Sequence, residues 1–371
     1  MRFFLKHHFD PDFDYQRLKP KTDDHGRVDH FNLGYVQNSI IGQVLAEWIP
    51  VPDDALPAGL DPKFVFDDKI FPAGHNCRPN PANPDQLVST ANGYVFYLDE
   101  KIHVKRVLNL RKGVNSRTGN VYFVSDAIVH GDVASGFECQ AQDIRVQGNV
   151  EAASLQAGGS VLIEGGIKGA KKGMVNAVRS IRCSYAENAI LKAGESIIVD
   201  GASMHCNLYA GRFITVRKRL VGGEVHSSHA VYVGEQLGGG MNTMTKVVLG
   251  YDAGLLARVE GLDTKIERLE ARLDLCSRQA EKGAAHKEGC LDEGAKLERK
   301  LDILKRKRAG TWEDLEAGFN PRAKLLIPGE IRPGVFVQIG SSQMKVNDFL
   351  RDKRFVLQDG EVAMLSPALE K

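Results

Sequence analysis

A short pattern of apolar residues recurs through the middle of the chain at a nearly constant spacing. Val161 and Ile181 are 20 residues apart, Ile181 and Ile197 are 16 apart, and the other steps are 17. A ladder of alanines, often followed by glycine as in "QAGGSVLIEG", keeps the same spacing a few residues ahead. Such a period is typical of a solenoid, in which each repeat forms one coil. The recurring pairs are Ile144 and Val146, Val161 and Ile163, Ile181 and Cys183, Ile197 and Val199, Ile214 and Val216, and Val231 and Val233.

The residues within a repeat alternate as they do in a β-strand. Ile197 and Val199 point one way, while Ser196, Ile198 and Asp200 point the other. At roughly 3.3 Å per residue, about 17 residues make three short strands, and coils stack about 4.8 Å apart with like residues above like. We therefore predict a mainly β chain with a parallel β-helix, in which the twelve paired residues form inward columns. Each buried aliphatic side chain contributes roughly 1.5–3 kcal/mol.

Composition and charge set the outer bounds on function. The 371 residues are 43% hydrophobic and 26% charged, with a net charge of +2, which does not indicate a nucleic-acid or membrane surface. The first residues lack the apolar core of a signal peptide, and no apolar run reaches membrane-spanning length, so we expect a cytoplasmic protein. The six cysteines, at positions 77, 139, 183, 206, 276 and 290, are scattered singly, which favours reduced thiols over metal ligands or disulfides.

A different periodicity follows the repeat. Apolar residues spaced alternately by four and three form a heptad seam, charged residues occupy the other faces, and the pattern weakens at "EKGAAHKEG" before it resumes. We predict two antiparallel helices in a coiled-coil hairpin, either a self-packed arm or a surface for a partner or a second copy. The seam residues are Leu255, Val259, Leu262, Ile266, Leu269, Leu273, Leu297, Leu301 and Leu304, and Cys276 falls on the same stripe.

The two ends of the chain read as short strands and turns. Residues 1–100 predict a small β-rich module in which Trp48 is packed, with ligand stacking as the alternative reading, and His7 and His8 lie in a start expected to be mobile. The tail alternates again and should pair with the β-helix to cover an open edge. The predicted division is 1–100 for the N-terminal module, 101–250 for the β-helix, 251–318 for the hairpin and 319–371 for the returning strands.

We considered catalytic and metal-binding alternatives on this scaffold. Cleavage of carbohydrate needs paired carboxylates across one groove, whereas Glu164, Asp200 and Glu235 fall on separate coils with Arg217 among them, which favours a solvated mixed-charge stripe. His226 and His229, with His205 about one coil earlier, are expected to be exposed and without a metal. No catalytic, cofactor-binding or metal-binding residues are predicted.

Three basic clusters have no interleaved aromatic residues, so nucleic acid is not an expected partner. A solvated face is the default reading of each cluster, and a salt-sensitive contact with an acidic protein or lipid surface is the alternative. The clusters are Lys168, Lys171 and Lys172; Arg217, Lys218 and Arg219; and Lys305 to Arg308.

Several motifs resemble one known family. The segment "NGYVFYLDEKIHVKRVLNLRKGVNSRTGNVYFVSDAIVHGDVASGFECQAQDIRVQGNVEAASLQAGGSVLIEGGIKG", the "VGGEV" turn, the hairpin and "IPGEIRPGVFVQIG" occur in the order seen in the bacterial FapA (flagellar assembly protein A) family. The similarity covers about two thirds of the chain. It implies a right-handed coil and a non-enzymatic cytoplasmic protein that acts in flagellar assembly or positioning, with no catalytic residues to carry over.

The favoured hypothesis is accordingly a scaffold or regulatory protein that binds other proteins. Flagellar-placement or signalling proteins are the expected partners. Recruitment of the protein to the cell pole or to the inner face of the membrane is compatible with this hypothesis. No cofactor and no transmembrane segment are expected. The alternatives are a β-helix enzyme that acts on envelope carbohydrate and a structural polymer like the bactofilins, and the second is disfavoured because both ends of the repeat carry material that can cap them.

Overall fold

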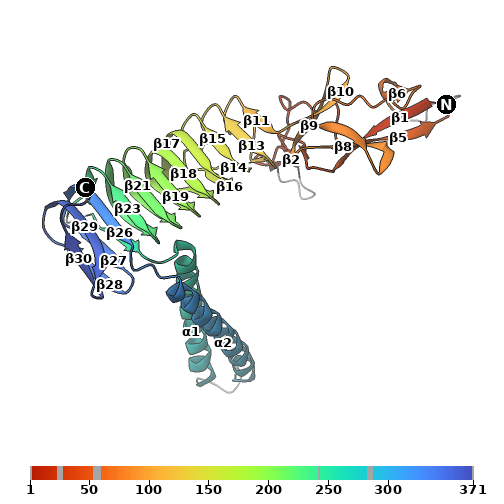
Figure 1. The fold of residues 1–371 in the computed structure, drawn as a ribbon. Coiled ribbons are helices and arrows are strands. Elements are labelled where there is room, and N and C mark those ends of the chain that lie inside the picture. Colours follow the sequence, from red (N-terminus) through yellow and green to blue (C-terminus); the bar gives the residue numbers. More distant parts are fainter. Residues whose placement is uncertain (1, 23–27, 53–59, 241–242, 282–286, 370–371) are drawn as a thin grey trace. The chain divides into compact units, whose positions relative to one another are not determined.

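The computed structural model describes residues 2–22, 28–52, 60–240, 243–281 and 287–369. The structure is mainly β, with a parallel β-solenoid of about eight turns, two helices and small N-terminal sheets (Figure 1). It divides into two compact units, Met1–Ile190 and Leu191–Lys371, which we describe separately. The four-part division read from the sequence stays a prediction.

Unit 1 begins with antiparallel sheets. Alternating apolar residues of β1 and β5 place Leu5, Leu45 and Trp48 in a core that Leu87 and Ile102 complete. Trp48 is only 5% exposed, which confirms that it is packed. The five-stranded sheet has the order β6-β1-β5-β8-β7, and β10-β9-β4 and β2-β3 form smaller sheets. The elements are β1 (Arg2–His7), β2 (Lys21–Thr22), β3 (Val28–Asp29), β4 (Asn38–Ser39), β5 (Val44–Val51), the 3-10 helix η1 (Pro62–Phe64), β6 (Val65–Phe66), β7 (Cys77–Asn80), β8 (Asn83–Ser89), β9 (Gly93–Leu98) and β10 (Lys101–Lys105).

The coils of unit 1 follow this module and lie directly against it. The Asn38 side chain donates to the Tyr122 carbonyl at 2.7 Å and accepts from the Val124 amide at 3.1 Å. The parallel register joins Ala127 to Ile144 and Ile144 to Val161, and it begins earlier, at β11, than the repeat visible in the sequence. The strands are β11 (Val107–Leu110), β12 (Val121–Tyr122), β13 (Asp126–Val129), β14 (Glu138–Ala141), β15 (Ile144–Val146), β16 (Ser154–Ala157), β17 (Val161–Ala177) and β18 (Ser180–Ala193), whose last residues fall in unit 2.

Unit 2 contains further coils with the same register. Ile197 pairs with Ile214, and Ile214 with Val231, so like residues stack above like. All twelve residues of the predicted inward columns, in both units, are exposed by 1% or less. The strands are β19 (Ser196–Val199), β20 (Ser203–Ala210), β21 (Phe213–Val216), β22 (Arg219–Ser227), β23 (Ala230–Val233), β24 (Gln236–Leu237) and β25 (Thr245–Leu249).

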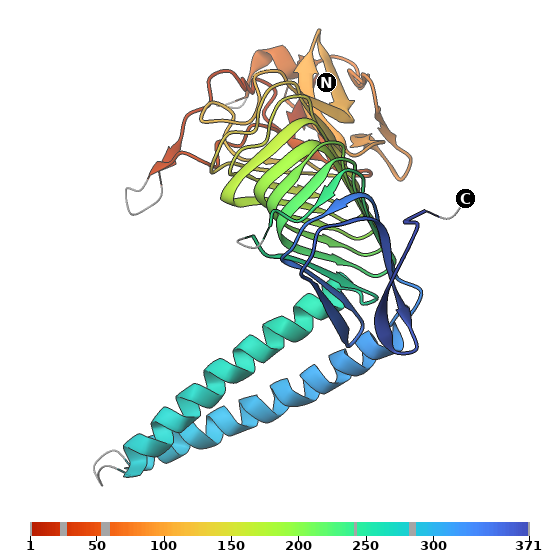
Figure 2. The same cartoon turned by 90° about the vertical axis from the view of Figure 1, so that its left-hand side faces the viewer.

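Two helices, α1 (Ala253–Glu281) and α2 (Lys287–Ala317), are inserted at one corner of unit 2. Strand β25 pairs with β22, and β26, which follows α2, pairs with β23. The preceding coil crosses the same corner with only Ser228 and His229, so residues 250–323 replace a two-residue corner. The helices run side by side in both views (Figures 1 and 2). The break between them was predicted at "EKGAAHKEG", residues 281–289; of these, 282–286 lie outside the described residues, and 287–289 already belong to α2.

The strands after the hairpin return to the coils of unit 2. Strands β26 (Lys324–Ile331) and β27 (Val335–Ile339) pair in parallel with β23 and β25, respectively. Antiparallel strands β28 (Ser342–Val346), β29 (Leu350–Gln358) and β30 (Glu361–Leu365) then follow, with β28 paired to β27 and β29 to β26. The switch to antiparallel pairing ends the regular stack in this unit.

Candidate functional site

The acidic residues singled out from the sequence are placed differently in the two units. In unit 1, Glu164 forms an ion pair with Arg145, at 2.6 Å from the guanidinium. In unit 2, Asp200 pairs with Arg217 at 3.2 Å. The amide of Glu235 donates to the carbonyl of Lys218, so Glu235 aligns with Lys218 and does not extend the Asp200–Arg217 pair. These pairs resemble an ordinary charged surface more than an acid–base catalytic pair.

Other acidic and amide side chains in unit 1 hold the corners of successive coils together. Asp132 accepts from the Asn149 amide at 2.6 Å, and Asn149 accepts from the Gly166 amide at 3.0 Å. Asp126 and Asp143 accept backbone amides of the next coil in the same way. Backbone donors at a corner have no partner in a strand ladder, so these side chains satisfy them. Their role is therefore structural.

A shallow depression of about 340 Å³ lies on the outer surface of unit 1, over β13, β15, β17 and β18. Arg145, Leu162 and Arg182 contribute to its lining together with Asp126 and Asp143. Both carboxylates already accept backbone amides, and Arg145 is paired with Glu164. The lining of the depression is mainly apolar, and neither of its two carboxylates is unengaged.

His226 differs from its predicted exposed position. It is 2% exposed and stacks on Tyr209 with ring centroids 4.8 Å apart, because β20 and β22 place Tyr209 and His226 at paired positions. Its Nε2 lies 3.4 Å from a Glu224 oxygen, and Lys246 lies 3.7 Å from the same carboxylate. Burial lowers the pKa of His226, and Glu224 opposes the shift. The sequence did not reveal this burial because the covering groups come from neighbouring coils.

No metal centre is found among the described residues, in which no three His, Cys, Asp or Glu side chains are placed to hold an ion. Five cysteines, Cys77, Cys139, Cys183, Cys206 and Cys276, are free thiols. Burial raises the pKa of Cys139 to about 12 and that of Cys77 to about 11, which makes both poor nucleophiles near neutral pH. Within the described ranges, neither helix has an apolar stretch long enough to cross a bilayer.

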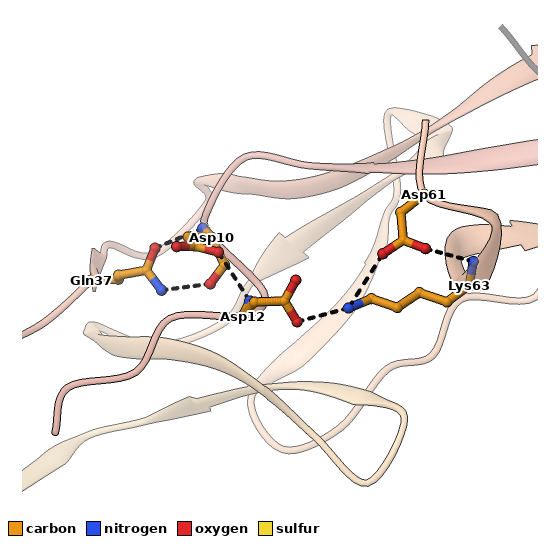
Figure 3. A network of polar contacts seen from close by, with 5 residues as sticks. All are labelled: Asp10, Asp12, Gln37, Asp61 and Lys63. Carbon is orange, nitrogen blue, oxygen red and sulfur yellow. Dashed lines mark hydrogen bonds and ion pairs between the residues drawn. The ribbon is translucent and has the colours of Figure 1, made fainter. Parts of the chain in front are cut away.

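A polar network fastens three loops of the N-terminal module (Figure 3). The Lys63 ammonium lies 2.7 Å from Asp12 and 3.5 Å from Asp61, and Asp61 also caps η1 by accepting the Lys63 amide. Gln37 exchanges two hydrogen bonds with the backbone of Asp10. The same Lys63 ammonium lies 4.7 Å from the centre of the Phe64 ring. The network therefore lies against an aromatic cluster formed by His7, Phe9, Phe64 and Tyr97.

His7 belongs to that aromatic cluster, which corrects the expectation of a mobile chain start. Its ring lies 4.4 Å from Phe64 and 5.2 Å from Phe9, measured between centroids, and its buried Nε2 has no hydrogen-bond partner among the described residues. Burial, with a smaller contribution from Lys63, lowers the pKa of His7 to about 4. The N-terminal module therefore holds a neutral histidine at neutral pH.

This histidine should make the N-terminal module acid-sensitive. An unfolded histidine titrates near 6.5, so the contribution of neutral His7 is complete above that pH and is lost as the pH falls toward about 4. We expect about 2 kcal/mol of unfolding free energy to be lost in this window, after allowance for partial solvent contact. His7→Leu should flatten the pH dependence. The unfolding free energy at each pH is measured by urea unfolding followed by Trp48 fluorescence, in a Trp312→Phe background. If this free energy depended on pH equally in both proteins, the lowered pKa of His7 would be wrong.

The hairpin of unit 2 is the remaining candidate, and its contacts fix two antiparallel helices. Ion pairs join Arg272 to Glu293, Glu270 to Lys305 (2.7 Å) and Asp263 to Arg308 (2.9 Å), so rising numbers on α1 meet falling numbers on α2. At the base, Tyr251, Val259 and Leu315 form a small core, and Tyr251 donates to Glu316 at 3.0 Å. Of the predicted seam, Val259, Leu262, Ile266, Leu297 and Leu301 are buried, and Leu255, Leu269, Leu273 and Leu304 are half-buried.

These observations describe a β-solenoid repeat protein with an inserted helical hairpin. Several acids of its coils accept backbone amides or pair with arginines. A family model described as the Flagellar Assembly Protein A β-solenoid domain, FapA, matches residues 106–362, well over half of the chain. The chain belongs to the FapA family. No curated protein and no solved structure gives a significant match. The family description names an assembly and no reaction.

Proposed function

We propose that this protein is a non-enzymatic scaffold that acts in flagellar assembly or positioning by binding other proteins, in the cytoplasm as the family resemblance implies. The observation that carries the proposal is the FapA match across the coils, the hairpin and most of the returning strands. It is supported by coil acids that are already engaged: Glu164 and Asp200 pair with arginines, and Asp132 accepts a backbone amide. Rigid coils and an inserted hairpin suit a protein that holds others.

Two alternatives have weaker support. A carbohydrate-cleaving enzyme needs a carboxylate pair free to act, and Glu164 and Asp200 are each within ion-pair distance of an arginine. End-to-end polymerisation needs open coil edges, and antiparallel strands β28 to β30 follow the last coils of unit 2. The identity of the partner and self-association through the hairpin stay predictions.

Complementation of a flagellated strain that lacks the gene tests the proposed function. We expect the deletion strain to have fewer or misplaced flagella. A variant in which a short Gly/Ser linker replaces residues 264–307 should fail to restore them, and the paired Asp263 and Arg308 mark two chain positions that a short linker can join. Motility and flagellar position are the readouts, and circular dichroism should show that the β signal is retained.

The matched control is the triple substitution Glu164→Ala, Asp200→Ala and Glu235→Ala. This variant should restore flagella fully, because the proposal gives these surface acids no role in binding or catalysis. Rescue by the hairpin deletion together with failure of the triple variant would reverse the ranking and favour an enzyme. A deletion strain with normal flagella would overturn the role in assembly altogether.

A further inference from the structure

Charges are distributed unevenly around the hairpin. At roughly 100° per residue, the seam of α1 separates two flanks of opposite sign. One flank carries Glu260, Asp263, Glu267, Glu270 and Asp274, and the other carries Arg258, Lys265, Arg268 and Arg272. The cross-helix ion pairs formed by Asp263 and Glu270 come from the acidic flank. Helix α1 is therefore acidic on one side of the seam and basic on the other.

Helix α2 continues the basic side. Lys305 and Arg308 lie on the flank of α2 that meets the acidic flank of α1, so the opposite flank of α2 adjoins the basic flank of α1. The Arg272–Glu293 pair joins those two flanks and supports the same assignment independently. Lys296, Arg299, Lys300 and Lys307 lie on this side of α2. We call Arg258, Lys265, Arg268, Lys296, Arg299, Lys300 and Lys307 the basic face.

Among the side chains that the structure describes, the cations of the basic face have no acidic partners. All seven are exposed, and none forms an ion pair with another described side chain. The described acids on this side lie toward its ends: Glu293, which pairs with Arg272, and Asp314 near the base of α2. Like charges three or four residues apart on a helix are mildly destabilising, and here they are left uncompensated. Such a surface is complementary to an anionic partner.

The spacing of the face indicates the kind of partner. Lys296, Lys300, Ile303 and Lys307 follow one another at steps of four, three and four, which is the row that a neighbouring helix contacts in a coiled coil. Ile303 is 64% exposed in the middle of this row and offers an apolar anchor. No aromatic residue belongs to the face, which disfavours stacking on nucleotides, and a single isoleucine is little apolar surface for insertion into lipid.

We propose that the basic face of the hairpin binds an acidic amphipathic helix of a partner protein. The proposal rests on the scaffold function and identifies its docking surface. The partner helix presents Asp or Glu at heptad spacing on both sides of a small apolar residue that meets Ile303. Binding is salt-sensitive because exposed charges supply most of the attraction.

The test uses the full chain and a labelled synthetic peptide of about three heptads, with glutamates at the facing positions and one central leucine. A scrambled peptide of equal composition is the control ligand. The variant Arg299→Glu, Lys300→Glu and Lys307→Glu should bind the peptide at least about tenfold more weakly by fluorescence anisotropy. Ile303→Ala should weaken binding about threefold to fivefold. The circular dichroism signal and melting temperature should not fall, because none of the three cations has an ion-pair partner among the described residues and Ile303 is mostly exposed.

The matched control reverses the same number of charges in unit 1, where Lys168, Lys171 and Lys172 are exposed along strand β17. This variant should bind the peptide as the wild-type protein does. Equal binding by both variants, or equal binding of the ordered and scrambled peptides, would overturn the proposal. So would tighter binding to phosphatidylglycerol vesicles or single-stranded DNA that is lost in the hairpin variant, or self-association through the basic face. The assay is independent of complementation, so its failure leaves the scaffold function standing.

Discussion

Replacement of Ile197 by lysine should abolish folded protein. Ile197 is fully buried between the coils of unit 2, where it pairs in register with Ile214. A lysine there would place an unpaired charge inside the column, at a cost of more than about 5 kcal/mol, comparable to the whole stability of many domains. Expression of soluble protein and the β signal in circular dichroism are the measurements.

The adjacent Ile198 provides a control of identical chemistry. It points to the outer side of the coil and is only half-buried, so a lysine at this position can reach water with its ammonium group. Ile198→Lys should therefore remain folded with a small change in melting temperature. If both lysine variants melted alike, the assigned register of this coil would be wrong.

Gly223→Ala should also be severely destabilising, through the backbone. Gly223 has φ +84, and a Cβ at this position would lie 2.1 Å from the carbonyl oxygen of Cys206 in the preceding coil. The left-handed conformation costs roughly 1–2 kcal/mol for a residue with a Cβ, and the clash forces neighbouring coils apart, so we expect about 3–5 kcal/mol in total. Thermal unfolding of the β signal measures the effect.

Gly360 separates the two causes of this loss. Its φ of +82 is nearly the same, but no atom lies within 4 Å of a Cβ built there. Gly360→Ala should therefore cost only about 1–2 kcal/mol, the conformational part alone. Equal losses at both positions would show that close stacking of the coils adds nothing to the requirement for glycine.

The sequence predicted the two helices that carry the basic face, but it was not used to predict which flanks of these helices are basic. The heptad seam predicted two helices, and the charges of α1 could have been sorted by flank from spacing alone. The matching flank of α2 needed the ion pairs Asp263–Arg308 and Arg272–Glu293, because antiparallel packing decides which flanks adjoin. The structural role of some acids in the coils could not be predicted from the sequence. Asp132 and Asp143 resemble ordinary surface charges in the sequence, but in the structure they accept backbone amides of the next coil.

The sequence by itself determined the repeat and the family. Stacking at a fixed rise forces each coil to present the same residue type at the same position, so the inward columns are visible as a period in the sequence alone. Ile144, Ile197 and Val231 could be assigned in this way.

Only the tertiary structure decided features built from residues far apart in the chain. His7 was expected in a mobile chain start and His226 on the surface, yet both rings are covered. Phe64, which covers His7, comes from the 3-10 helix η1, and Tyr209, which covers His226, comes from strand β20. The hairpin looked like a separate segment after the repeat, yet it fills the corner between β25 and β26 while the strands around it keep their register. An antiparallel helix pair brings its two ends together, so a coil tolerates the insertion at a corner, and no local pattern records which corner was used.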